Sequence, residues 1–149
     1  MPSHALPSHA LAHRAPRGLG ALLLAALLAA GALYSAAALA GPHAREAAKH
    51  ARVAIQHGQE ALDAGAGDPR GIAMHAREAV RHAEEAVRHA REDFRQTRNR
   101  HVKEFIEHTE EGVEHLEEAV DLAGRGDGRA ALRHAREGMR HLREGFRHL

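Results

Sequence analysis

Histidine recurs at every seventh residue through most of the chain, and this spacing constrains the fold more than any other feature. Twelve histidines follow residue 40, at His43, His50, His57, His75, His82, His89, His101, His108, His115, His134, His141 and His148. Side chains seven residues apart return to nearly the same side of an α-helix. Turn-rich stretches at residues 63–71, 95–100 and 123–128 divide the repeat into four groups of three. The sequence therefore predicts four helices and an all-α fold.

Capping residues indicate where these helices begin. Asp68 precedes Pro69, which is a typical start signal, and Asp127 can cap the last helix. Thr97 or Asn99 can cap the third helix. The first helix is expected from about residue 43 to 64, and the second ends near residue 96. Because the first pair resembles the second, we expect an antiparallel up-and-down four-helix bundle built from two helical hairpins.

The heptad also predicts which side of each helix is buried. The residue after each histidine and the residue five positions after it are mostly apolar, and we expect them to form the seam of the bundle. The residue four positions after each histidine is mostly Ala or Gly and is expected to flank this seam. Phe105 and Asp93 break that rule. Histidine then lies at the edge of the helix–helix interface, where antiparallel neighbours bring two stripes together.

Charge and composition exclude several functions. The chain contains no cysteine, which rules out disulfides, thiolate metal sites and cysteine nucleophiles. Its formal net charge of +1 and its three Phe, one Tyr and no Trp provide no platform for binding nucleic acid. The third segment is acid-rich and the fourth is base-rich, which favours pairing of these two helices.

The first forty residues have a different composition from the rest. Residues 21–40 are uncharged and apolar and end in Ala38-Leu39-Ala40, a pattern typical of signal peptidase sites. We interpret residues 1–40 as a cleaved signal peptide and residues 41–149 as the histidine-rich bundle. An uncleaved membrane anchor is the alternative. Cleavage predicts a periplasmic protein without stable membrane association, and the lack of cysteine is compatible with that compartment.

The spacing of histidine and glutamate favours metal binding. Histidines seven residues apart are separated by about 10.5 Å along a helix and cannot share one ion. Glutamate four residues before a histidine is its neighbour on the helix surface. The possible helper residues are Glu46, Glu78, Glu85, Glu104, Glu111, Glu137 and Glu144. Imidazole and carboxylate suit Cu(II), Ni(II) and Zn(II), with Cu(II) bound most tightly. Val53 replaces glutamate between two histidines, so weaker binding is expected there.

Two other function classes compete with metal binding. A di-iron enzyme would need inward Glu-x-x-His motifs, but no heptad histidine has glutamate three residues before it. We also expect no carboxylate on the seam, and therefore no enzyme. A structural or partner-binding bundle needs only the amphipathic repeat, since duplication of one heptad copies a histidine whether or not it is useful.

The region after residue 42 resembles the small metal-binding protein family. The resemblance rests on "HAREAVRHAEEAVRHARE" (75–92), "HVKEFIEHTEEGVEHLEEAV" (101–120) and "RHAREGMRHLREGF" (133–146). It implies periplasmic export, an up-and-down bundle, and reversible binding of several divalent ions with a preference for copper. The heptad histidines would be the ligands and the glutamates possible helpers. This chain departs from the family pattern because its predicted turns contain no histidine.

Overall fold

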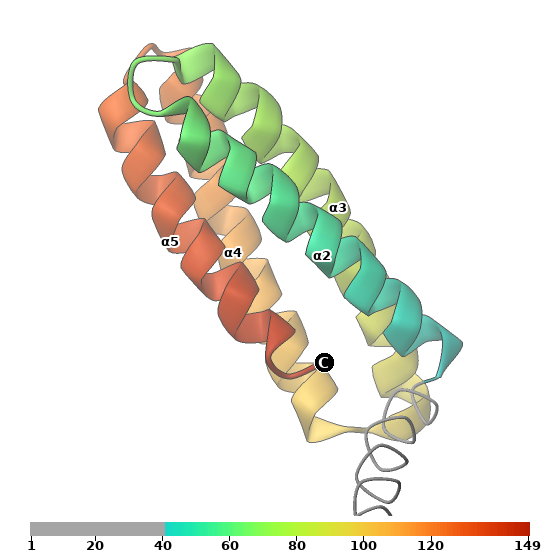
Figure 1. The fold of residues 1–149 in the computed structure, drawn as a ribbon. Coiled ribbons are helices and arrows are strands. Elements are labelled where there is room, and N and C mark those ends of the chain that lie inside the picture. The colour runs from blue at the N-terminus through green and yellow to red at the C-terminus, as the bar shows by residue number, and fades with distance from the viewer. Residues whose placement is uncertain (1–40) are drawn as a thin grey trace, which may run out of the picture. The chain divides into compact units, whose positions relative to one another are not determined.

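Four antiparallel helices form the part of the chain that the computed structural model describes, residues 41–149 (Figure 1). These helices are α2 (Pro42–Ala64), α3 (Pro69–Thr97), α4 (Arg100–Gly124) and α5 (Gly128–Phe146), with no strand among them. The main packing partners are α2 with α3 and α4 with α5. The predicted up-and-down bundle of two hairpins is confirmed, and none of these four helices could cross a membrane. The predicted signal peptide lies outside the described residues.

Three polar side chains cap the helices where the sequence predicts. The carboxylate of Asp68 accepts a hydrogen bond from Gly71 N at 2.9 Å, and Asp127 accepts one from Ala130 N at 2.9 Å. Of the two possible caps for α4, Asn99 fills the role by accepting from His101 N at 2.9 Å. These bonds satisfy backbone donors in the first turn, which have no partner within the helix.

The core lies on a different stripe of each helix from the one expected. The residues four positions after histidine, which we expected at the flank, are the most deeply buried, as at Ala54, Ala79 and Gly112. Several of the larger residues five positions after histidine, expected in the seam, are only half-buried; these are Ile55, Val80, Val113, Val120 and Phe146. The expected seam is therefore wrong for these five residues.

Helix geometry explains this shift of the core. At about 100° per residue, the positions one and four after histidine point only about 60° apart. Small side chains at the second position let the helices approach until both positions face the bundle axis. Histidine and the residue five after it then lie about 70° on either side of that axis. The histidines are half-buried, apart from the exposed His101.

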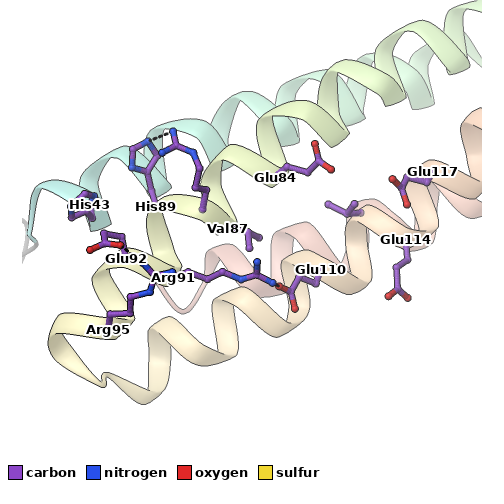
Figure 2. Close-up of a pocket in the computed structure, with 12 residues that line it drawn as sticks. His43, Glu84, Val87, His89, Arg91, Glu92, Arg95, Glu110, Glu114 and Glu117 are labelled. Carbon is purple, nitrogen blue, oxygen red and sulfur yellow. Dashed lines mark hydrogen bonds and ion pairs between the residues drawn. The ribbon is translucent and has the colours of Figure 1, made fainter.

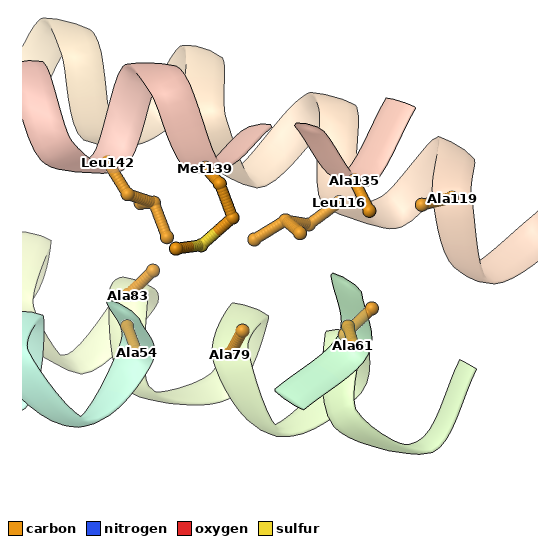
Figure 3. Close-up of a cluster of buried hydrophobic side chains, with 10 residues drawn as sticks. Ala54, Ala61, Ala79, Ala83, Leu116, Ala119, Ala135, Met139 and Leu142 are labelled. Atoms are coloured by element: carbon orange, nitrogen blue, oxygen red, sulfur yellow. The ribbon is translucent and has the colours of Figure 1, made fainter. Parts of the chain in front are cut away.

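Larger side chains from one hairpin fill the core against alanines of the other. Leu116, Met139 and Leu142 on α4 and α5 extend towards Ala54 and Ala83 on α2 and α3 (Figure 3). Within the second hairpin, glycine allows contact between backbones: a Cβ on Gly138 would lie 2.9 Å from the carbonyl oxygen of Gly112. This close approach also brings the flanking histidines of α4 and α5 together.

Candidate metal sites

The histidines of each hairpin form a ladder along the line where its two helices meet. The first ladder consists of His43, His50 and His57 on α2 and His75, His82 and His89 on α3. The second ladder consists of His101, His108 and His115 on α4, His134 and His141 on α5, and His148 in the turn that follows α5. Neighbouring rings from opposite helices have centroids 5.5 to 6.3 Å apart. The expected meeting of histidine stripes is therefore observed.

Five groups of two histidines and one glutamate bring potential ligand atoms within 4.8 Å of one another. In each group the histidines come from opposite helices of a hairpin. The groups are His50–Glu85–His89, His57–Glu78–His82, His57–Glu60–His75, His101–Glu104–His148 and His108–Glu111–His141. Because bonds to divalent metals are about 2.0–2.2 Å long, two ligand atoms on one ion lie at most about 4.4 Å apart, so side-chain movement is needed to close some of these groups around an ion.

Glutamate bridges the two facing histidines directly in three of the groups. Glu60 Oε2 lies 2.8 Å from His57 Nδ1 and 3.0 Å from His75 Nδ1. Glu111 Oε2 lies 2.8 Å from His141 Nδ1 and 3.5 Å from His108 Nδ1. These side chains already converge on one point, where a cation would have two imidazoles and a carboxylate beside it.

Glu104 forms the third bridge, where the start of α4 lies beside the end of α5. Its Oε2 atom lies 3.2 Å from His148 Nδ1 and 3.3 Å from His101 Nδ1. Histidine and glutamate contacts thus join α4 to α5. The charge contrast between these helices predicted the correct neighbours, although the ion pairs connecting them in the described part of the chain involve histidine rather than arginine.

The helper glutamates adopt two geometries. Glu78 and Glu85 on α3 join the histidine four residues later, as the sequence predicts. Glu104 and Glu111 on α4 instead join the histidine three residues earlier. In both geometries the carboxylate is directed towards the facing helix, whose histidine completes the group.

Some expected ligands are not brought into such a group. His43, His115 and His134 contact other rings of their ladders but lie in none of the five groups. Three predicted helpers also lie in none of the groups and pair with neighbouring cations: Glu46 with Lys49 at 3.4 Å, Glu137 with Arg140 at 2.9 Å and Glu144 with Arg147 at 2.7 Å.

Glu60 belongs to a group but was missed by the sequence reasoning. That reasoning sought glutamate four residues before a histidine, whereas Glu60 follows the last histidine of α2 by three residues. The sequence signal was the His-x-x-Glu spacing itself. The facing helix supplies Glu78 and Glu85 to His57 and His50, so carboxylates are present even though Val53 replaces glutamate between these two histidines.

One histidine is shared by two groups at the turn end of the first ladder. His57 combines with Glu60 and His75, and also with Glu78 and His82. A neutral imidazole has one free lone pair, so His57 can serve only one of these positions at a time. The groups of the second ladder share no residue.

The local electrostatics favour the protonation states that bind metal. Burial lowers the pKa of His82 and His89, and the neighbouring Arg81 and Arg88 lower each further. Hydrogen bonds from arginine lower the pKa of Glu78 and Glu85. Neutral imidazole and ionised carboxylate are the forms with lone pairs available for a cation.

Several buried imidazole nitrogens have lone pairs or protons left without a partner. Nδ1 of His89 and Nδ1 of His134 are buried and have no hydrogen-bond partner within residues 41–149. His108 Nδ1 and His141 Nδ1 are also buried, and Glu111 approaches them outside hydrogen-bonding geometry. Leaving buried polar atoms unpaired is unfavourable, and an ion bound at Nδ1 of His108 or His141 would satisfy that nitrogen. The nitrogen and oxygen donors fit Cu(II), Ni(II) or Zn(II).

One carboxylate does lie in the core, contrary to the expectation that the seam contains none. Asp93 is only 6% exposed, and its backbone carbonyl accepts a hydrogen bond from Thr97 Oγ1 at 3.0 Å. Its position, four after His89, belongs to the core rather than to the flank. Carboxylate-bridged di-iron centres need several inward-facing glutamates and histidines, and Asp93 is the only buried carboxylate in residues 41–149.

A groove between α3 and α4 carries a different set of side chains. The buried Val87 and the half-buried Val113 contribute to its lining, together with Glu84, Glu114 and Glu117 (Figure 2). Arg91 crosses the groove to form an ion pair with Glu110. The end of the first ladder borders this groove. The carboxylates that line the groove belong to none of the five groups found in residues 41–149.

Comparison with known proteins gives one family. The family model described as "Small metal-binding protein" matches residues 19–145, which include all four helices except the end of α5. Comparison with curated proteins gave no match.

Proposed function

Since the chain belongs to the small metal-binding protein family, we propose that it binds several divalent transition-metal ions reversibly through its two histidine ladders. The ligands are the twelve ladder histidines, assisted by glutamates within or beside the ladders. The protein would hold these ions as cargo, for buffering, storage or detoxification.

The observation that best supports this proposal is the placement of two histidines and a glutamate in each group. A single helix presents one histidine and one glutamate, which is an incomplete ligand set. Packing of the hairpin adds a histidine from the opposite helix within 4.8 Å. Since these ligands come from both helices, ion binding would be coupled to the folded hairpin.

Copper(II) is the ion we propose to bind most tightly. Sites of imidazole and carboxylate follow the general order in which Cu(II) exceeds Ni(II) and Zn(II). Softer ligands that would select Cu(I) are scarce, because the chain has no cysteine and Met74 and Met139 are its only methionines after residue 40. We propose that Ni(II) and Zn(II) bind to the same sites more weakly.

We propose that the protein acts in the periplasm. This part of the proposal rests on residues 1–40, whose apolar run and Ala-Leu-Ala end have the composition of a signal peptide. Expression of the full chain in a bacterium tests it: the periplasmic fraction should contain a protein whose N-terminal residue is Gly41. Recovery of the intact chain in the membrane fraction would indicate an anchor instead.

Calorimetric titration of Cu(II) into residues 41–149 at neutral pH, with Ni(II) and Zn(II) in parallel, tests the binding itself. Several ions should bind per chain and be released together on acidification, because imidazole must be neutral to bind. Replacing His82 and His89 by Ala should lower the number of ions while the helix content is kept. Binding of no ion would favour the alternative, a partner-binding bundle with unused repeat histidines.

A further inference from the structure

The sequence motif Glu-x-x-Arg-His occurs four times, and metal binding as proposed above gives its arginine no role. It spans residues 78–82 and 85–89 on α3, and residues 137–141 and 144–148 at the end of the chain. The glutamate and histidine are expected metal ligands, while arginine is a cation and cannot bind a metal. Among the seven helper pairs, arginine stands directly before the histidine in four, lysine in one and glutamate in two. The placement of arginine between two ligands therefore requires a physical explanation.

The arginine contacts both ligands of its own motif. Arg81 Nη2 lies 2.9 Å from Glu78 Oε2 and 2.9 Å from His82 Nε2. The next copy repeats the contact, since Arg88 Nη2 reaches Glu85 Oε2 and lies 3.3 Å from His89 Nε2. One nitrogen therefore lies between a carboxylate oxygen and an imidazole nitrogen, where an ion shared by the pair would lie.

The second hairpin contains the same contact. Arg140 donates through Nε to Glu137 Oε2 at 2.9 Å and lies, through Nη2, 3.0 Å from His141 Nε2. In the last copy Arg147 pairs with Glu144 at 2.7 Å. This repetition on α3 and α5 argues for a feature of the motif rather than the accidental position of one flexible side chain.

The hydrogen bonds of Arg81 also determine which nitrogen of the His82 ring carries the proton. Because guanidinium only donates, His82 Nε2 must accept, and the neutral ring then carries its proton on Nδ1. That proton is directed to His50 Nδ1, which is 3.2 Å away on the facing helix. Arginine thus keeps the imidazole neutral and satisfied, and the carboxylate ionised, when no ion is bound.

We propose that Arg81 and Arg88 act as internal cations that occupy the metal positions of the first ladder in the metal-free protein and leave when an ion binds. This inference depends on the proposed metal binding and adds to it a competitor built into the chain. Binding would exchange one cation for another, which weakens affinity and makes release easier. The side chains of Arg81 and Arg88 are 58% and 66% exposed, so they can move into solvent without disturbing the core.

The strength of this competition follows from the exposure of the pairs. Exposed ion pairs contribute up to about 1 kcal/mol each, which corresponds to about a five-fold change in a binding constant. The double variant Arg81→Gln/Arg88→Gln should therefore bind Cu(II) more tightly, by up to about five-fold, at each of the two affected groups. Gln keeps two of the three methylene groups of arginine but removes the charge.

Arg91→Gln/Arg95→Gln is a matched control on the same helix. Arg95 pairs with Glu92 at 2.7 Å in the same three-residue spacing, but residue 96 is glutamine instead of histidine. Arg91 pairs with Glu110, and no hydrogen bond or ion pair within residues 41–149 joins it to a ladder histidine. The control thus removes the same number of positive charges from α3, but it does not free a glutamate and histidine of one metal group.

The test is a competition titration of Cu(II) against a chelator of known affinity, in the full-length chain and both double variants, with helix content checked by circular dichroism. We expect tighter binding only in Arg81→Gln/Arg88→Gln. Unchanged or weaker binding in that variant would overturn the proposal, and so would equal tightening in the control, because net charge alone would then explain it. Failure of the unaltered chain to bind Cu(II) would instead refute the proposed function.

Discussion

Replacement of Gly138 by alanine should separate the two helices of the second hairpin. An added Cβ would lie 2.9 Å from the carbonyl oxygen of Gly112 and 2.8 Å from Leu116 Cγ. Real Cβ atoms do not come within 3.0 Å of such neighbours. Leu116 is fully buried, and the carbonyl belongs to the backbone of α4, so the helix itself must move.

The expected magnitude combines two opposing effects. Overpacking of a buried contact costs about 1–3 kcal/mol, while replacing glycine by alanine within a helix recovers about 1 kcal/mol. We therefore expect a net loss of about 0–2 kcal/mol in the free energy of unfolding. The steric cost is measured by comparing the unfolding free energy of this variant with that of a control variant in which only the helix propensity changes.

Gly124→Ala provides that control on α4. No atom lies within 4 Å of a Cβ added at Gly124, and its φ is not in the left-handed region. Denaturant unfolding of both variants should place Gly138→Ala about 1–3 kcal/mol below Gly124→Ala. Equal stability of the two variants would refute the inference that backbone contact between α4 and α5 limits their separation.

Three further predictions follow from buried polar groups and from ion binding. Thr109 is 2% exposed and its buried hydroxyl has no hydrogen-bond partner within residues 41–149, so Thr109→Val should raise the unfolding free energy by about 1 kcal/mol; destabilisation in denaturant melts would contradict this. Because burial lowers the pKa of His82 and His89, the unfolded chain takes up protons at these rings more readily than the folded chain does. Stability of the metal-free protein should thus be complete above about pH 6.5 and fall below it, and His82→Gln/His89→Gln should reduce that fall; an identical pH profile in urea melts would refute it. Cu(II) at a hundred-fold excess over Kd should add about 2.7 kcal/mol per site, and an unchanged Tm would mean that the unfolded chain binds equally well.

The helices and their pairing could be predicted from the sequence because local rules determine them. Asp68, Asn99 and Asp127 stand directly before the helices that they cap, and the histidine spacing has a helical period. The turns between paired helices are short, so antiparallel hairpins follow.

The position of the core was harder to predict than the helices, because it depends on how closely the helices approach one another. A ranking by hydrophobicity favours Val80 and Val120 over Ala79 and Ala119. Close packing reverses the order, since only the small residues fit near the bundle axis, and the valines remain half-buried.

The meeting of two histidine stripes was predicted, but which glutamate joins which facing histidine was beyond the reach of a single-helix pattern. Glu60 faces His75, which lies on the next helix, and its place in a group depends on the relative shift of α2 and α3. The contact of arginine with histidine could not be predicted for the same reason, because spacing identifies an ion pair but not the nitrogen that the guanidinium also contacts.

The most direct test of metal binding across the hairpins is to count the histidines bound to each Cu(II). Pulsed electron paramagnetic resonance on protein with less than one equivalent of Cu(II) detects the nitrogens of bound imidazoles. We predict two imidazoles per ion, since each group takes one histidine from each helix of a hairpin. A single imidazole per ion, with binding kept when one helix of the hairpin loses its histidines, would contradict this arrangement and indicate that each helix binds metal on its own.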